Sequence, residues 1–430
     1  MTYDYAIKLR IYPNNEQKKF LSKNFGCCRF VYNKMIEERK EVYQLYKNNK
    51  DTLHNYKYRT EKQLKELYPF LKEADSNSLQ QARRHLQTAY KNFFNSIKDR
   101  KNKKTKRYVG YPKFKSRHSK QSYTTCITNN NIKIDWNKKL LKLPKLRQWI
   151  RFRDDRLVDA DIRNVTISKT KAGHYFASIL FKANIQTEDS KRIISEDKII
   201  AFDMSAKDFL VNENFRFANP RFYRNSLNTL KRKHRVLSRK KLGSKNREKA
   251  KLILAKQYDK INHQKNDWTH KITHRLSKTY EAIILEDLNI EGMKQFNSGL
   301  AKSVSLDFSW NQFKTYLEYK CKRERNHFVL VKRYFPSSKL CSVCGYKNTE
   351  LTLNERDWIC PECKSHHDRD ENASINLRKE GIRILQEEKH ITIIHDDTIT
   401  VGTTGSHAFG DRVRPYSVKA TVMESGIHSL

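Results

Sequence analysis

Residues 198–203 read Lys-Ile-Ile-Ala-Phe-Asp, a run of apolar residues that ends at an acid. Residues 282–286 repeat the pattern as Ala-Ile-Ile-Leu-Glu. Short continuous apolar runs of this kind indicate strands buried on both faces of a sheet. A third apolar run follows at residues 328–331. The order of elements is strand, hairpin, helices, strand, helix and strand, which predicts a mixed α/β sheet.

The segment between the first two runs is strongly basic. Residues 208–211 and 215–218 are expected to form the hairpin, and residues 221–278 a pair of helices. The charge-dense stretch of this pair consists of Lys231, Arg232, Arg235, Arg239, Lys240 and Lys241. Two interpretations remain open: a solvated helical face, or contact with the phosphate backbone of a nucleic acid.

An acid ends each of the first two runs, and a third acid, Asp370, opens a helix expected from residue 370 onward. Active sites of α/β sheets form at strand ends, and Mg²⁺ prefers carboxylate oxygens. Two Mg²⁺ ions would activate water and neutralise the leaving oxygen during phosphodiester hydrolysis. Asp203, Glu286 and Asp370 are therefore catalytic candidates. Each also has an ordinary interpretation, because acids after strands are often solvated and an Asp before a helix is often an N-cap.

Four of the eight cysteines have the spacing of metal ligands: Cys341, Cys344, Cys360 and Cys363. Two such C-x₂-C pairs, fifteen residues apart, are typical of a structural Zn²⁺ site with four thiolate ligands. An iron–sulfur cluster is chemically possible but fits this ribbon spacing less well. Because no secretion signal opens the chain, we expect a cytoplasmic protein without disulfides.

Charge predicts the class of partner. The 430 residues include 88 Lys and Arg against 47 Asp and Glu, a formal net charge of +41. An AT-rich genome would account for part of the lysine but not for this excess, which a polyanion must neutralise. No run of eighteen apolar residues exists, so nothing is expected to span a membrane. With 37% hydrophobic residues, the chain is expected to form folded domains that bind nucleic acid.

The first half of the chain alternates between strand and helix patterns. Residues 3–11 alternate as a half-buried strand, whereas residues 16–46 and a segment after Ser76 are typical of helices. Short strand patterns then fill residues 100–182, with a hairpin turn at 170–173. We expect a small β-barrel or sheet that includes the first strand and is interrupted by the helices.

Several segments resemble a known family. IIAFDMSAKDFLV, IILEDLNIEGM and HDRDENASINL resemble the three RuvC blocks of TnpB proteins from insertion sequences, and PSSKLCSVCG resembles their zinc ribbon. Upstream, KLRIYPNNEQKKFLSKNFGCCRFVYN and YPKFKSR resemble the family's N-terminal segment and its Pro-Lys-Phe-Lys motif, and NDWTHKITHRL resembles the stretch before the second block. The chain is therefore similar to TnpB proteins, relatives of the compact type V CRISPR nucleases, from about residue 5 to 380.

The resemblance implies a multidomain α+β protein with an RNase H-like nuclease domain. The implied domains are a wedge β-barrel at 1–13 and 99–190, a helical recognition domain at 14–98, a RuvC-like domain at 191–336 and 366–386, a zinc ribbon at 337–365 and a disordered tail at 387–430. The implied activity is RNA-guided, Mg²⁺-dependent cleavage of double-stranded DNA beside a short transposon-adjacent motif. The guide RNA would derive from the transposon end.

The resemblance also assigns roles to residues. Asp203, Glu286 and Asp370 would form the catalytic trio, with Asp287 and Asp368 as less favoured neighbours. His367 and Arg369 would shape the site, and Arg369 would bind the scissile phosphate.

One departure matters. The first block of the family usually reads Gly-Ile-Asp-x-Gly, whereas residues 201–205 read Ala-Phe-Asp-Met-Ser, so the acid is kept and both glycines are lost. An alternative function is therefore a nuclease-inactive, RNA-guided DNA-binding repressor. Two further alternatives are a transposase, or an accessory nucleic-acid-binding protein with a zinc ribbon and no chemistry. Retention of the three acids favours the enzyme.

Overall fold

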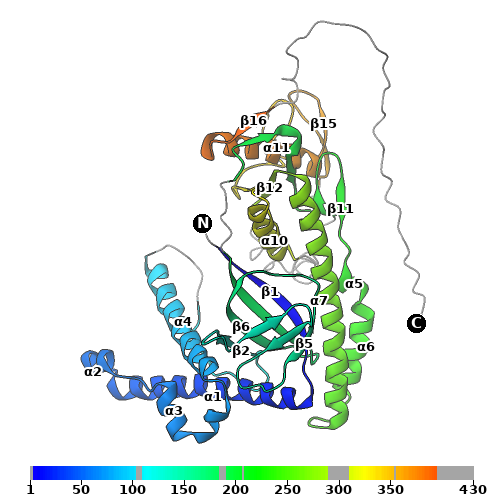
Figure 1. Cartoon of the computed structure of the whole chain (residues 1–430). Helices are drawn as coiled ribbons and strands as arrows, with labels where there is room; N and C mark the ends of the chain where they lie inside the picture. Colours follow the sequence, from blue (N-terminus) through cyan, green and yellow to red (C-terminus); the bar gives the residue numbers. More distant parts are fainter. Residues whose placement is uncertain are drawn as a thin grey trace, which may run out of the picture.

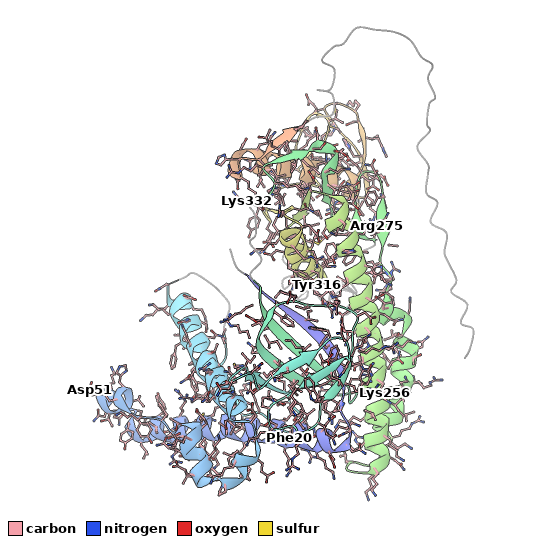
Figure 2. All side chains as sticks on the ribbon, viewed as in Figure 1. Phe20, Asp51, Lys256, Arg275, Tyr316 and Lys332 are labelled. Carbon is pink, nitrogen blue, oxygen red and sulfur yellow. The ribbon has the colours of Figure 1, made fainter. Side chains whose placement is uncertain are left out.

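The computed structural model describes residues 3–102, 109–183, 190–205, 208–288, 309–352 and 355–394. Within these residues, two β-sheets lie beside opposite halves of the long helix α7 (Lys245–Thr279) (Figure 1). Figure 2 labels Lys256 on the half of α7 beside the larger sheet and Arg275 on the half beside the smaller one. Among the helices of these residues, none combines the length and the apolar composition of a membrane span.

The larger sheet has seven strands in the order β2-β6-β7-β1-β5-β4-β3. Their bounds are β1 Tyr3–Tyr12, β2 Gln121–Cys126, β3 Lys133–Asp135, β4 Leu140–Lys142, β5 Ile150–Arg153, β6 Asp161–Lys169 and β7 Tyr175–Ala183. Strand β1 pairs antiparallel with both β7 and β5, which confirms that the first strand joins the later sheet. Gly173, at φ +85°, closes the predicted turn between β6 and β7. In the described residues the pairing ends at β2 and β3 and does not close into a full barrel.

Helices fill the sequence between β1 and β2. They are α1 Asn15–Tyr46, α2 Lys50–Asn55, α3 Glu61–Leu67, the 3₁₀ turn η1 Pro69–Glu73 and α4 Ser76–Lys101. Asn14 begins α1 with a capping box that includes Gln17, which satisfies free N–H groups of the first turn. Leu21 of α1 and Leu79 of α4 are buried in the same hydrophobic cluster as Ile167 of the sheet. The helices and the seven-stranded sheet therefore share one core.

The smaller sheet has three parallel strands in the order β13-β12-β9. They are β9 (Ile199–Phe202), β12 (Ala282–Glu286) and β13 (His327–Val331), and an antiparallel bridge from Asp203 to Val211 adds the hairpin of β10 (Asp208–Val211) and β11 (Arg216–Ala218). Helix α10 (Trp310–Arg323) packs on the face that buries Leu285, and α11 (Arg369–Arg383) on the face that buries Ile284. The predicted mixed α/β sheet is confirmed.

The basic segment forms the helices α5 (Phe222–Asn225), α6 (Leu227–Ser238) and α7, as the sequence predicts. Ser244 caps α7 by accepting a hydrogen bond from the Arg247 backbone N–H. Leu230 of α6 and Leu254 of α7 are buried together, so the two helices pack as a hairpin beside the larger sheet (Figure 1).

The prediction of a disordered tail from residue 387 is wrong for its first residues. A π-helical turn, η3 (Ile384–Glu388), leads into β16 (Thr392–Ile394), which pairs in parallel with β8 (Ile193–Ser195). Ile391 and Ile393 are buried against the smaller sheet. A three-residue strand is too short to produce a periodic pattern, so it could not be predicted from the sequence. Residues 395–430 lie outside the described residues.

Gly381 allows α11 to approach β12 closely. A Cβ atom at Gly381 would lie 2.3 Å from Cδ1 of Ile284. We expect Gly381→Ala to destabilise the protein by about 1–3 kcal/mol, the usual effect of overpacking, although alanine favours a helix by about 1 kcal/mol. Gly26→Ala in α1 is the matched control, because its Cβ would meet no atom within 4 Å. Thermal unfolding checks this, and an equal loss in both variants would contradict the close-packing argument.

Candidate active site and zinc-ligand cluster

Two of the candidate acids are neighbours on adjacent strands. Phe202 at the end of β9 pairs in register with Leu285 of β12. The next residues, Asp203 and Glu286, therefore lie side by side at the carboxyl end of the parallel sheet. Neighbouring strands are about 4.8 Å apart, and the charge of Glu286 contributes to the raised pKa of Asp203.

The third acid reaches this site from a helix. Asp370 lies in the first turn of α11, directly after the short strand β15 (His366–Asp368). Its Oδ2 accepts hydrogen bonds from the Ser205 hydroxyl at 3.0 Å and from Nη1 of Arg356 at 3.2 Å. Sequence reasoning missed Arg356, because no spacing rule connects an exposed arginine of the zinc-ribbon segment to a carboxylate of α11.

Asp203 lies within electrostatic reach of both other acids. Burial raises the pKa of Asp203 to about 7, and the negative charges of Asp370 and Glu286 add to the effect. Burial also raises the pKa of Glu286 to about 7, with a further contribution from Asp287. A divalent cation bound between these acids would offset both the burial and the repulsion.

The two less favoured acids have structural partners. Asp287 accepts hydrogen bonds from Lys314 at 2.9 Å and Arg333 at 3.2 Å, and the bond from Lys314 is the main reason that its pKa is lowered. Asp368 caps α11 by accepting from the backbone N–H groups of Asp370 and Glu371. Both carboxylates are therefore engaged in holding the site together.

Arg216 of β11 was also missed at the sequence level. Its guanidinium lies 2.9 Å from Asp368 and 2.8 Å from Glu371. It therefore ties the amino end of α11 to the β10–β11 hairpin and helps to fix the position of Asp370.

The loss of both first-block glycines fits the backbone. Neither Ala201 nor Ser205 is among the described residues with positive φ, so neither position needs glycine. Ala201 is fully buried beside α11, and Ser205 contributes the hydroxyl that binds Asp370. The substitutions therefore leave the three acids together.

The raised pKa values predict a link between pH, Mg²⁺ and stability. An acid whose pKa is raised on folding favours its protonated form, so its contribution to stability falls as pH rises from about 4 to about 7. Mg²⁺ should therefore raise the melting temperature more at about pH 8 than at about pH 5.5, by on the order of a few °C. Asp203→Asn should remove most of this difference. Thermal unfolding at both pH values checks it, and an equal Mg²⁺ effect at both would contradict it.

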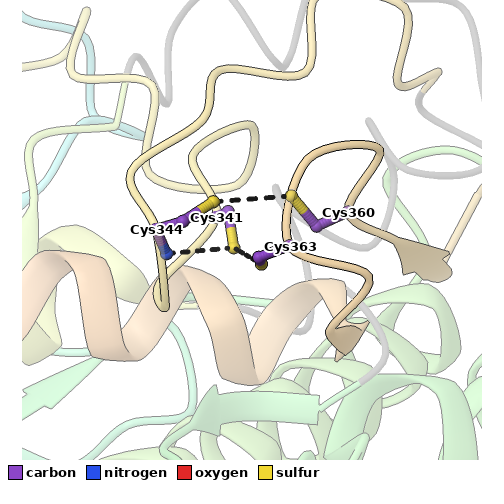
Figure 3. Close-up of side chains that lie close together, drawn as sticks. All are labelled: Cys341, Cys344, Cys360 and Cys363. Atoms are coloured by element: carbon purple, nitrogen blue, oxygen red, sulfur yellow. Dashed lines mark hydrogen bonds between the residues drawn. The ribbon is translucent and has the colours of Figure 1, made fainter.

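The four predicted zinc ligands come together in two loops (Figure 3). Their Sγ atoms lie within 4.8 Å of one another. Cys341 and Cys363 are 3.6 Å apart, as are Cys344 and Cys360. Zn–S bonds of about 2.3 Å in a tetrahedron place sulfur atoms about 3.8 Å apart, so the cluster fits one Zn²⁺. Among the described His, Cys, Asp and Glu side chains, no other group is this close.

Backbone geometry explains how each loop presents its thiols. Gly345, at φ +78°, follows Cys344 in the first loop, and Lys364, at φ +59°, holds the same position in the second. Although burial raises the pKa of Cys341, nearby N–H and hydroxyl groups lower it to about 5, including the Cys344 backbone N–H. His367 contributes to this effect, with Nε2 3.1 Å from the Cys341 sulfur. A thiolate is the form that binds zinc.

We expect wild-type protein to hold about one Zn²⁺ per chain and Cys360→Ser to hold almost none, because serine does not replace a thiolate ligand. The loss should also lower the melting temperature. Elemental analysis of purified protein checks it. Cys126→Ser, which changes a cysteine outside the cluster, should keep its zinc, and well-folded wild-type protein without zinc would refute the assignment.

The predicted nucleic-acid contacts do not all lie together. The six basic residues of the stretch 231–241 are exposed on α6 and the turn after it, and no ion pair engages any of them in the described part of the chain. Arg369 lies instead at the start of α11, where it donates to the Thr352 carbonyl at 3.1 Å. Its positive charge offsets a small part of the rise in the pKa of Asp203.

A basic cleft was not predicted from the sequence. It has a volume of about 870 Å³ and lies between α1, the start of β2, the β6–β7 turn and α7. Its basic lining residues are Arg29, Arg117, Lys120, Lys169, Lys171 and Lys251. These residues are far apart in the sequence and become one surface only through folding, so no local charge pattern reveals the cleft.

The chain is similar to known proteins over most of its length. The chain is 33% identical over 380 residues to a Streptomyces pristinaespiralis protein named "Putative RNA-guided DNA endonuclease", covering 88% of this chain and 89% of the relative. The chain belongs to the TnpB family. The chain is also 26% identical over 402 residues to an Escherichia coli (strain K12) protein, "Putative RNA-guided DNA endonuclease InsQ". That match covers 88% of this chain and 93% of the relative.

Family models match three parts of the chain: "Helix-turn-helix domain" at 1–48, "Probable transposase" at 184–297 and "Cas12f1-like, TNB domain" at 310–377. In this TnpB-family chain the first of these segments forms β1 and the single long helix α1. The solved Cas12f1-sgRNA-target DNA complex is similar over 88% of this chain and 99% of that one, with 15% identity and a TM-score of 0.43.

Proposed function

We propose that this chain is an RNA-guided, Mg²⁺-dependent DNA endonuclease of the RuvC type. The observation that carries the proposal is the convergence of Asp203, Glu286 and Asp370 at one end of a parallel sheet, where two of the three have a pKa of about 7. Carboxylate oxygens of this kind are suitable ligands for Mg²⁺. The names of the relatives support the same activity.

In the proposed reaction, the ionised forms of Asp203, Glu286 and Asp370 would hold the metal ions. Bound Mg²⁺ would supply an activated water and neutralise charge on the leaving oxygen. Arg356, 3.2 Å from Asp370, would neutralise part of the acid cluster before metal binds and could turn toward the scissile phosphate. Ser205 would hold the Asp370 carboxylate in place through its hydrogen bond.

We propose two surfaces for the nucleic acids. The exposed basic stretch on α6 would contact the backbone of the guide–target heteroduplex, and the cleft beside α7 would hold RNA phosphates. Arg369 would act at the catalytic site instead. The wedge, recognition, nuclease and zinc-ribbon boundaries implied by the family resemblance remain part of this proposal, as do the transposon-adjacent motif and the origin of the guide.

Two steps test the proposed function. The protein is purified after expression with its own flanking DNA, and the RNA that copurifies is sequenced. Plasmids carrying a sequence matched to that RNA are then incubated with the complex and Mg²⁺. We expect double-strand cleavage of matched plasmids only. A complex that binds the matched target and leaves it uncut with Mg²⁺ would support the nuclease-inactive repressor instead.

A further inference from the structure

Two buried asparagines connect the first zinc loop to helix α11. Asn372 accepts a hydrogen bond from the Ser342 N–H at 2.9 Å and donates to the Leu340 carbonyl at 2.7 Å. Asn376, one turn later, donates to the carbonyls of Leu340 at 2.7 Å and Ser337 at 2.8 Å. Both asparagines are buried, with 1% and 5% of their surface exposed.

Asparagine suits this task because its amide is both a donor and an acceptor. One Asn372 side chain thus binds the backbone on both sides of Cys341, the zinc ligand. Lys379 adds a surface contact, donating to the Ser342 carbonyl at 2.6 Å. Positions 372, 376 and 379 lie on one face of the helix, and the zinc loops pass over that helix (Figure 3).

The other face of α11 packs on the sheet that carries the remaining acids. Leu377 is buried with Ile284 of β12, and Gly381 allows the two elements to approach closely. Helix α11 therefore lies between the zinc loop and the strand that ends at Glu286. Asp370 precedes Asn372 by two residues, within the turn that the zinc loop holds.

We propose that Asn372 and Asn376 are positioning residues, through which the zinc loop fixes Asp370 opposite Asp203 and Glu286 for metal binding. The inference rests on the proposed function, since it assumes that the three acids bind a divalent cation. In this proposal the zinc loop positions an active-site acid in addition to folding around its own Zn²⁺. Without the two amides, the loop would still bind zinc, but the first turn of α11 would no longer be held against it.

The experiment measures Mn²⁺ binding directly, by electron paramagnetic resonance on the complex with copurified RNA and no target DNA. The signal of interest is the Mn²⁺ that wild-type protein binds and Asp203→Ala does not bind. We expect the Asn372→Ala/Asn376→Ala variant to raise the dissociation constant of that Mn²⁺ about tenfold. Zinc content and target-DNA binding should not change, and cleavage should recover partly at high Mg²⁺.

Ser374→Ala is the matched control. Ser374 is equally buried on α11, but its hydroxyl donates only to the Glu371 carbonyl of the same helix, so its removal should leave Mn²⁺ affinity unchanged. If the double variant fails to fold, Lys379→Met takes its place with a smaller shift in the same direction.

Mn²⁺ affinity equal to that of wild type, or weakened only together with zinc loss, would overturn the inference. Absence of Asp203-dependent Mn²⁺ binding in the wild type would instead overturn the proposed function.

Discussion

Asp203→Ala, Glu286→Ala and Asp370→Ala are each expected to slow cleavage of a guide-matched target at least about 10³-fold, or about 4 kcal/mol of transition-state stabilisation. In the proposed site each acid would contribute oxygen ligands from a different element, so losing one would remove part of the coordination of at least one metal ion. RNA-guided DNA binding should survive, because base pairing and Lys and Arg contacts elsewhere supply it. Removing one negative charge from a chain of net charge +41 should strengthen binding slightly.

The controls follow from the contacts of the neighbouring acids. Asp368→Ala is a poor control, because Asp368 caps α11 and its loss would displace Asp370. Asp368→Asn keeps an oxygen that can accept the same N–H groups, and Asp287→Asn keeps an acceptor for Lys314. Both should retain most of the cleavage rate. Cleavage and binding are measured on the same targets with the same guide RNA.

Two further outcomes are informative. Ca²⁺ should support binding but poor cleavage, since its longer and looser coordination misplaces the attacking water. If Asp203→Ala still cuts at nearly the wild-type rate, the assignment of Asp203 is wrong, and the lost glycines of the first block would then indicate a displaced or abandoned site.

The strands of the smaller sheet could be predicted because their signal is local. Ile199–Phe202 and Ala282–Leu285 are continuous apolar runs, and each ends at an acid where the strand ends. Their pairing in register, which makes Asp203 and Glu286 neighbours, is a tertiary feature that only the structure shows. The four cysteines were predictable for a similar reason, because metal-ligand spacing is a constraint that the sequence displays directly.

The partners of these residues were not predictable, because they come together only through tertiary contacts. Arg356 meets Asp370 across the zinc-ribbon segment, and Arg216 reaches Asp368 from a hairpin more than a hundred residues earlier. A basic residue of a +41 chain carries little information about which acid it will contact. A helix-cap role was considered for Asp370, whereas the residue that caps α11 is Asp368, two residues earlier.

Deletion of the chain end is the second change from which we expect a large effect on cleavage and stability. We expect deletion of residues 387–430 to lower cleavage at least about tenfold and to lower the melting temperature, whereas deletion of 395–430 should change neither. The longer deletion removes β16, which pairs with β8, and the buried side chains of Ile391 and Ile393. Truncating each buried isoleucine costs about 2–5 kcal/mol, and the exposed edge of β8 invites aggregation. The shorter deletion removes none of these contacts.

Point variants of the full-length chain separate packing from length. Ile391→Ala and Ile393→Ala should each lower the melting temperature, whereas Ile394→Ala on the same strand should not, because that side chain is 46% exposed. The guide RNA is supplied from a separate plasmid, so that changed codons cannot alter it. Unfolding temperature and cleavage rate are compared for all five variants. If deletion of 387–430 leaves both at wild-type values, the β8–β16 pairing contributes nothing to the nuclease fold, and the structured domain ends before residue 387.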